Sequence, residues 1–208
     1  MWAADSSRKP QPIDNCLLAA VIGQDPLRHY TRPEVGGTLQ TNSMELRSLT
    51  REDLRLYERI YTDPRMWAEL GGVLEQDVTE NFERAVASVE GDRRWVLVIV
   101  TDEGTAVGTV SLWDHQWEGE AIDEIGWMVL PQYQGRGLAS AGVTEALRRA
   151  DAAGRWRKLH AFPATTNAPS NALCRKHGFA LRGPIDFYYT YGERTLHVNH
   201  WVRDKLSA

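Results

Sequence analysis

The 208-residue sequence has few cysteines, no closely spaced set of metal ligands and little net charge. Its two cysteines, Cys16 and Cys174, form no CxxC pair and no disulfide framework, which favours a reducing, cytoplasmic compartment. Its six histidines show no HExxH or related spacing, so we expect no metal site. The net charge of −4 disfavours nucleic acid or an anionic membrane as the main partner, because proteins that bind them usually present a basic face.

Long apolar runs are also absent. No run approaches the roughly 20 residues that a membrane-spanning helix needs. The segment CLLAAVIG follows Arg8 and Lys9 and so resembles a short signal peptide, but Asp14 and Asn15 stand at its front and no small-x-small cleavage site follows. With 42% hydrophobic and 25% charged residues, the composition is instead that of an ordinary globular domain.

Residues 1–43 differ from the rest of the chain. They carry scattered prolines, a Gly36-Gly37 pair and a single short apolar run, which predicts one short helix at 14–22. We interpret 1–43 as an N-terminal extension that is partly ordered or packed on a domain formed by residues 44–208.

Hydrophobic periodicity predicts an α/β (α+β) domain built on one mixed, mostly antiparallel sheet of about seven strands flanked by helices. Thr50 and Asp53 have the spacing of a helix capping box, and Pro131 ends a strand because proline cannot donate to a ladder. The predicted elements are a strand at 44–49, a helix after Thr50 that Pro64 interrupts, a helix at 78–89, a hairpin around Asp102-Glu103-Gly104, a loop at 115–121, a strand at 122–130, a helix from Leu138 to Gly154, a strand at 158–164, a helix between Asn167 and Gly178, and a terminal hairpin at 179–202.

The turn PQYQGRGLASAG, residues 131–142, joins a strand to a helix and contains three glycines and Arg136. Two interpretations fit it: a plain glycine-rich connection, or a cradle of backbone N–H groups for a phosphate at a helix N-terminus. It is neither a P-loop, which needs GxxxxGK followed by Ser or Thr, nor a GxGxxG dinucleotide fingerprint.

Two motifs resemble the GNAT acetyltransferase superfamily. Residues 134–139, QGRGLA, are similar to its Q/R-x-x-G-x-G/A signature, and NAPSNALCRKHGF resembles a segment of its ribosomal-protein acetyltransferase branch. The resemblance covers residues 44–202, about three quarters of the chain. It implies a GNAT-type sheet that is splayed between strands four and five.

The resemblance also implies that acetyl-CoA is the co-substrate. Backbone N–H groups of residues 134–140 would receive the pyrophosphate, the backbone beside the splay would pair with the pantetheine, and Asn167 would hydrogen-bond the pantetheine arm or only cap its helix. Asn171 is expected to be an exposed helix residue. The predicted coenzyme-binding residues are Met128, Val129, Gln134, Gly135, Arg136, Gly137, Leu138, Ala139, Ser140, Asn167 and Ser170.

Three residues are predicted to act in catalysis. The resemblance implies that the backbone N–H of Val129 polarises the thioester carbonyl. Glu124 is the candidate base, because DEIGW resembles the strand that carries the glutamate base in histone acetyltransferases of this superfamily and nearby tryptophans would raise its pKa. A strand-edge salt bridge or binding of the acceptor ammonium also fits. Cys174 stands where many relatives have a tyrosine as general acid, so the thiol or water is expected to protonate the leaving thiolate. His160 is interpreted as structural rather than catalytic.

Aromatic and acidic residues of the first helices, the 115–121 loop and the last hairpin suit a cationic amine. We therefore predict direct attack by a small cationic amine in a ternary complex with a monomeric or homodimeric enzyme. A protein N-terminus or lysine is the alternative acceptor, and a non-catalytic acyl-CoA-binding module is the alternative of another class. The predicted acceptor-binding residues are Tyr57, Trp67, Trp113, His115 and Tyr189.

Overall fold

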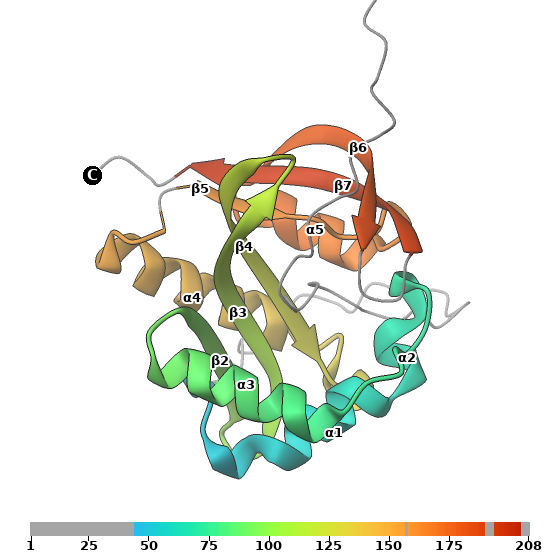
Figure 1. The fold of residues 1–208 in the computed structure, drawn as a ribbon. Coiled ribbons are helices and arrows are strands. Elements are labelled where there is room, and N and C mark those ends of the chain that lie inside the picture. The colour runs from blue at the N-terminus through green and yellow to red at the C-terminus, as the bar shows by residue number, and fades with distance from the viewer. Residues whose placement is uncertain (1–43, 157, 190–193, 205–208) are drawn as a thin grey trace, which may run out of the picture.

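The computed structural model describes residues 44–156, 158–189 and 194–204. Figure 1 shows one twisted sheet with helices packed on both of its faces. The strands are β1 (Met44–Ser48), β2 (Arg94–Thr101), β3 (Ala106–Trp117), β4 (Glu120–Val129), β5 (Lys158–Ala161), β6 (Ala180–Tyr189) and β7 (Arg194–Asp204). The helices are α1 (Leu54–Thr62), α2 (Pro64–Trp67), α3 (Val78–Glu90), α4 (Leu138–Ala153) and α5 (Ala168–Lys176), with short 3-10 turns at Arg51–Asp53, Ala68–Leu70 and Pro131–Tyr133.

The seven strands form a mixed sheet in the order β1-β2-β3-β4-β5-β7-β6. Every neighbouring pair is antiparallel except β4 and β5, which run parallel. The parallel pairing consists of Asp123↔Leu159 and Glu124↔His160, whereas β4 continues to Val129. The predicted mixed sheet and its splay between the fourth and fifth strands are therefore confirmed.

Each face of the sheet has its own layer of core. On one face, α1, α2 and α3 pack residues such as Phe82 against strand residues such as Val98. On the other face, α4 and α5 contribute to a second layer in which Val143 lies with Trp127. Because side chains alternate along a strand, Glu124 belongs to the face that α1–α3 cover.

Local sequence signals set the ends of the helices. The Thr50 N–H donates to Asp53 Oδ2 over 2.8 Å, as the capping-box spacing predicts. Asp77 caps α3 in the opposite sense, because here the N-cap side chain accepts: its Oδ1 accepts from the Glu80 N–H at 2.9 Å. At the other end of α4, Gly154 takes a left-handed conformation with φ of 68°, which suits glycine and ends the helix.

The predicted loop at 115–121 is wrong. The ladder between β3 and β4 continues through Gln116↔Ala121 to Trp117↔Glu120, which leaves a turn of two residues. Glu118 and Gly119 both have positive φ, 51° and 84°, the conformation of a tight hairpin turn that matches the twist of its strands. The sequence lacks the usual Asn-Gly or Asp-Gly signal at this turn. The long hairpin places His115 and Glu124 on neighbouring strands.

Several predictions fall on residues 1–43, and they lie outside the described residues: the N-terminal extension, its short helix and Cys16. Among the described helices, none has both the length and the apolar character needed to cross a membrane. Within the same ranges, no cluster of three or more His, Cys, Asp or Glu side chains is arranged to hold a metal ion.

Candidate active site

The glycine turn leads into consecutive backbone N–H groups at the start of α4. Gly135 and Gly137 have φ of 72° and 80°, a region that favours glycine, and a Cβ at either position would meet nothing within 4 Å. The first intrahelical bond runs from the Ala141 N–H to the Gly137 carbonyl at 3.0 Å. The N–H groups of Leu138, Ala139 and Ser140 therefore have no acceptor within the helix, and the helix dipole adds partial positive charge there. This is an anion-binding geometry.

The splay turns the backbone of Val129 toward the opening between β4 and β5. The Leu130 N–H donates to the Val107 carbonyl of β3 at 2.9 Å, so by alternation the groups of Val129 point to the other side. There the side-chain amide of Gln134 donates to the Val129 carbonyl at 2.8 Å. The same alternation turns the backbone of Met128 toward β3, and a Cβ at Gly108 would collide with the Met128 carbonyl oxygen. The geometry thus supports the prediction for Val129 more than that for Met128.

A cation from α5 joins the glycine turn. Lys176 Nζ donates to Ser140 Oγ at 2.7 Å, and His177 Nε2 lies 3.3 Å from the same oxygen. The Arg136 guanidinium stacks over the ring of Tyr133, 5.3 Å from its centroid. Sequence reasoning did not identify Lys176, and the signal for it was the basic end of the segment CRKHGF. The start of α4 therefore has positive side chains beside its free N–H groups.

The start of α5 is held by buried amides. Asn167 Oδ1 accepts from the Ser170 N–H at 3.1 Å, so the predicted cap is present. Asn171 is buried, contrary to the expected exposed position, because its amide joins α5 to β7. Its Nδ2 donates to the carbonyls of Ala164 and Asn167, and its Oδ1 accepts from Asn199 Nδ2 and Trp201 Nε1, both at 2.8 Å. The hydroxyl of Ser170 is buried and has no partner among the described residues.

A carboxylate–imidazole pair lies on the α1–α3 face at the point where β4 and β5 separate. Glu124 is 2% exposed, and its Oε2 lies 2.8 Å from His115 Nε2. Its second oxygen, Oε1, is buried without a partner among the described residues. The neighbouring Trp113, the register partner of Glu124, also has a buried indole N–H with no partner in that part of the chain.

Burial and mutual charge shift both members of the pair. Burial raises the pKa of Glu124 because it disfavours the anion, and the hydrogen bond and charge of His115 oppose this only in part. Burial would lower the pKa of His115, but the hydrogen bond and charge of Glu124, the Gln116 carbonyl and Asp114 together raise it. Hence the pair retains a proton more readily than either group alone in water.

Aromatic and imidazole rings cluster next to this pair, where His160 of β5 is the register partner of Glu124. His200 Nε2 lies 3.0 Å from His160 Nδ1, and the two rings stack with centroids 5.0 Å apart. The ring of Trp117 meets His200 edge-on at 4.8 Å. Burial, followed by the charge of His200, lowers the pKa of His160 to about 4, which keeps it neutral near pH 7. His160 therefore has a hydrogen-bonded place in the packing, in agreement with the structural interpretation.

Other predicted residues lie in the core. Cys174 is fully buried in the layer beneath α4 and α5, and burial raises the pKa of its thiol to about 12. A thiol that holds its proton this firmly is a poor acid for a leaving thiolate, so Cys174 fits a core position better than the predicted role of general acid. Tyr57 and Trp67 belong to the core under α1–α3, where the Tyr57 ring stacks on Tyr61. The side chain of Tyr189 lies outside what the structure describes.

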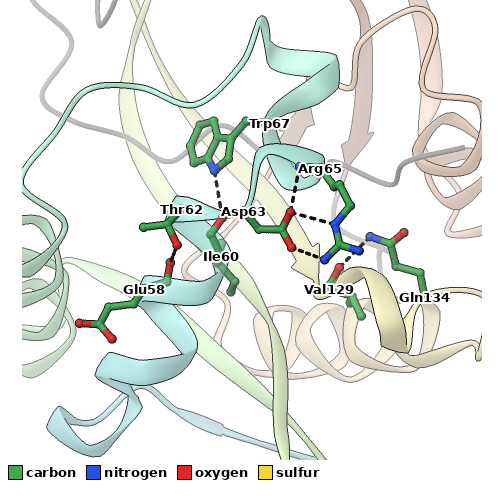
Figure 2. A network of polar contacts seen from close by, with 8 residues as sticks. All are labelled: Glu58, Ile60, Thr62, Asp63, Arg65, Trp67, Val129 and Gln134. Carbon is green, nitrogen blue, oxygen red and sulfur yellow. Dashed lines mark hydrogen bonds and ion pairs between the residues drawn. The ribbon is translucent and has the colours of Figure 1, made fainter.

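The corner between α1 and α2 is fixed by its own polar contacts. The Trp67 indole donates to the Ile60 carbonyl at 2.9 Å, and the Arg65 guanidinium pairs with Asp63, the cap of α2. Figure 2 shows this corner together with the hydrogen bond from Gln134 to the end of β4. Trp67 thus has a packing role beside any contact with an acceptor.

Comparison with protein families matches residues 43–180 to the model of the acetyltransferase (GNAT) domain. A comparison with curated proteins finds no match.

Solved structures of similar fold include spermidine N-acetyltransferase from Vibrio cholerae in complex with CoA and spermine, with a TM-score of 0.66 and 18% identity over 78% of this chain and 95% of that one. Ribosomal-protein-S5-alanine acetyltransferase from Vibrio fischeri has a TM-score of 0.64 and 15% identity, with coverage of 84% and 98%. The protein yncA from Salmonella typhimurium, solved with its cofactor acetyl-CoA, has a TM-score of 0.65 and 20% identity, with coverage of 80% and 96%. At these identities the likeness establishes the fold.

Proposed function

The chain belongs to the GNAT family and is an acetyl-CoA-dependent N-acetyltransferase, and we propose that its acceptor is a small cationic amine that attacks directly in a ternary complex. The observation that carries this proposal is the buried carboxylate of Glu124. One of its oxygens lacks a partner among the described residues and lies on the face of the splayed sheet that α1–α3 cover.

The residues at the start of α4 fit the coenzyme. Open space in front of Gly135 and Gly137 leaves room for a phosphate to reach the free N–H groups of Leu138–Ser140. Arg136 and Lys176 add positive charge at the same place. When bound, acetyl-CoA supplies an acetyl group activated as a thioester. Gln134, Asn167 and Ser170 are proposed to line its path, with Ser170 offering a buried hydroxyl.

Val129 and Glu124 then have different tasks. The Val129 N–H, turned away from β3, donates a hydrogen bond to the carbonyl oxygen of the bound acetyl group and so favours attack on its carbon. Glu124 Oε1 accepts a hydrogen bond from the acceptor amine and takes its proton, which makes the nitrogen nucleophilic. Burial suits Glu124 to this task because a carboxylate with a raised pKa is a stronger base.

A cationic amine suits this site better than an anionic acceptor. Glu124 offers an unpartnered carboxylate oxygen, among the described residues, beside the aromatic surface of its register partner Trp113, which favours a cation. The low exposure of Glu124 favours a slender primary amine that can enter the site. The likeness to enzymes described as acting on spermidine and on a ribosomal-protein alanine supports an amine acceptor and keeps a peptide N-terminus as the second candidate.

An acceptor panel tests the proposal. The full chain and acetyl-CoA are incubated with polyamines, amino sugars, amino acids and peptides that carry a free N-terminus or a lysine, and acetylated products are quantified by mass spectrometry. We expect acetylation of at least one small amine with a kcat/KM at least tenfold above that of any peptide. The opposite ranking overturns the small-amine proposal in favour of a peptide acceptor. Coenzyme binding without acetylation of any amine overturns both.

A further inference from the structure

Both ring nitrogens of His115 face oxygen atoms. Nδ1 lies 3.2 Å from the Gln116 carbonyl oxygen, and Nε2 lies 2.8 Å from Glu124 Oε2. A carbonyl can only accept, so Nδ1 carries a proton. The second contact then requires one shared proton, held either by Glu124 Oε2 or by His115 Nε2. The two side chains therefore form a chain of hydrogen bonds with a proton at each link.

This chain runs from a buried oxygen toward the surface. At its inner end, Glu124 Oε1 is buried and has no partner among the described residues. At its outer end, the side chain of His115 is 7% exposed, and its Nδ1 contacts the carbonyl of Gln116. Gln116 and the other strand neighbour, Asp114, are both exposed. The side chain of Glu124 is 3% exposed and lies one hydrogen bond further from these exposed residues. A proton that reaches Glu124 therefore needs a second group in order to leave.

We infer that His115 is a proton-transfer residue that carries the acceptor amine's proton from Glu124 to water, and this inference rests on the proposed function. An N–H bond of the ammonium breaks and an O–H bond forms at Glu124 Oε1. The proton between Oε2 and Nε2 moves fully onto Nε2, and the Nδ1 proton of His115 leaves to water. One proton enters the pair and one leaves it, so its net charge is unchanged. The starting arrangement would return once Oε1 gives its proton to the departing thiolate and Nδ1 takes a proton from water.

The charged surroundings favour this direction. Asp114 on the same strand helps to hold positive charge on His115 while the proton passes. His160 of β5 is the register partner of Glu124, but burial and the charge of His200 lower its pKa and keep it neutral. On the β2 side, Arg94 is the register partner of Trp113. Of these neighbours, His115 alone has a hydrogen bond to the Glu124 carboxylate among the described residues.

A merely structural His115 predicts a different outcome. If its only task were to hold Glu124 in place, an asparagine that keeps a donor near Oε2 would preserve the rate, and added imidazole would have no effect. A proton carrier can be replaced by a small diffusible base but not by an amide. These two roles are therefore separable by experiment.

The first test needs no acceptor. Histidine-labelled full-length protein is titrated by NMR, in the wild type and in Glu124→Gln. We expect the pKa of His115 to lie above the ordinary value near 6.5 in the wild type and to fall on removal of the carboxylate. Equal titration of His115 in both proteins overturns the inference. Because no amine is present, the result is independent of whether the small-amine proposal holds.

The second test uses whichever amine the panel identifies. We expect His115→Ala and His115→Asn each to lower kcat by about a hundredfold, with imidazole restoring at least a tenth of the lost rate in His115→Ala. Acetylated amine is measured, so that acetyl transfer to imidazole is not counted. His197→Ala, which removes an exposed histidine paired with Asp186, is the matched control and should keep the wild-type rate. Full activity of His115→Asn, or no rescue by imidazole in a folded His115→Ala, overturns the inference.

Discussion

The proposed donor half and the proposed acceptor half of the active site are built from different parts of the chain. On the donor side the groups that matter belong to the backbone: the N–H groups that open α4 and the Val129 N–H beside the splay. On the acceptor side the important groups are side chains among closely packed rings, with Glu124 hydrogen-bonded to His115. The donor half tolerates many side chains but requires particular backbone φ angles, whereas the acceptor half requires particular side chains.

This difference predicts which substitutions impair the function of each half. A backbone cradle is damaged when glycine is replaced, because the conformation and the close approach of an anion are both affected. A side-chain site is damaged when one functional group is exchanged, even if the shape is kept. Three substitutions, taken from the largest expected effect to the smallest, test the distinction.

Gly137→Val is expected to weaken coenzyme binding at least tenfold. A branched side chain at φ of 80° is strained by about 1–3 kcal/mol, and a backbone shift that relieves this strain would displace the N–H groups that directly follow. The matched control is Gly104→Val in the β2–β3 turn, which has a similar φ of 76° and equally open surroundings. Calorimetry with CoA should show normal affinity for Gly104→Val and a similar loss of thermal stability in both. Equal affinities in the two variants would contradict the cradle.

Trp113→Phe is expected to raise the KM for the amine about three- to tenfold and leave CoA affinity unchanged. The substitution keeps an aromatic ring in the core and removes a buried N–H that has no partner among the described residues. Loss of one hydrogen bond to a ligand costs about 0.5–1.5 kcal/mol. Steady-state kinetics with both substrates varied separates the two halves. A change in CoA affinity instead would show that the halves are not independent.

The smallest effect concerns pH and stability. The pKa of His160 is lowered to about 4 in the folded protein, against about 6.5 when unfolded. A depressed pKa means that the unfolded state binds the proton first, so this contribution to stability is present above pH 6.5 and is lost as the pH falls toward 4. His160→Phe should therefore show a smaller drop in Tm between pH 7 and pH 4 than the wild type. An unchanged drop would assign the acid sensitivity to other groups.

Much of the fold was predictable because glycine, proline and capping residues mark element ends in the sequence. The cap at Thr50, the break at Pro64 and the left-handed end at Gly154 all follow from local conformational preferences. The tight turn at Glu118-Gly119 was missed because its first residue is an uncommon choice at positive φ.

The site was predictable where a sequence motif requires a particular backbone geometry. It was less predictable where hydrogen-bonded side chains are distant in sequence. Gly135 and Gly137 mark the start of α4 in the sequence. No local sequence pattern predicts the hydrogen bonds between Lys176 and Ser140 or between Trp201 and Asn171. His115 was predicted to contact the acceptor, and its bond to Glu124 appeared only with the register of the hairpin. The burial of Cys174, which removes it as an acid, likewise depends on tertiary packing.

The two-residue turn at Glu118-Gly119 has a consequence for how this sequence can change over evolutionary time. It fixes Trp113 opposite Glu124 and His115 opposite Ile122, so His115 and Glu124 meet diagonally. A slip of one residue in this pairing would send one partner to the opposite face of the sheet. The length of this turn is therefore under tighter constraint than its composition, and insertions are tolerable here only where they leave the pairing beyond the turn intact.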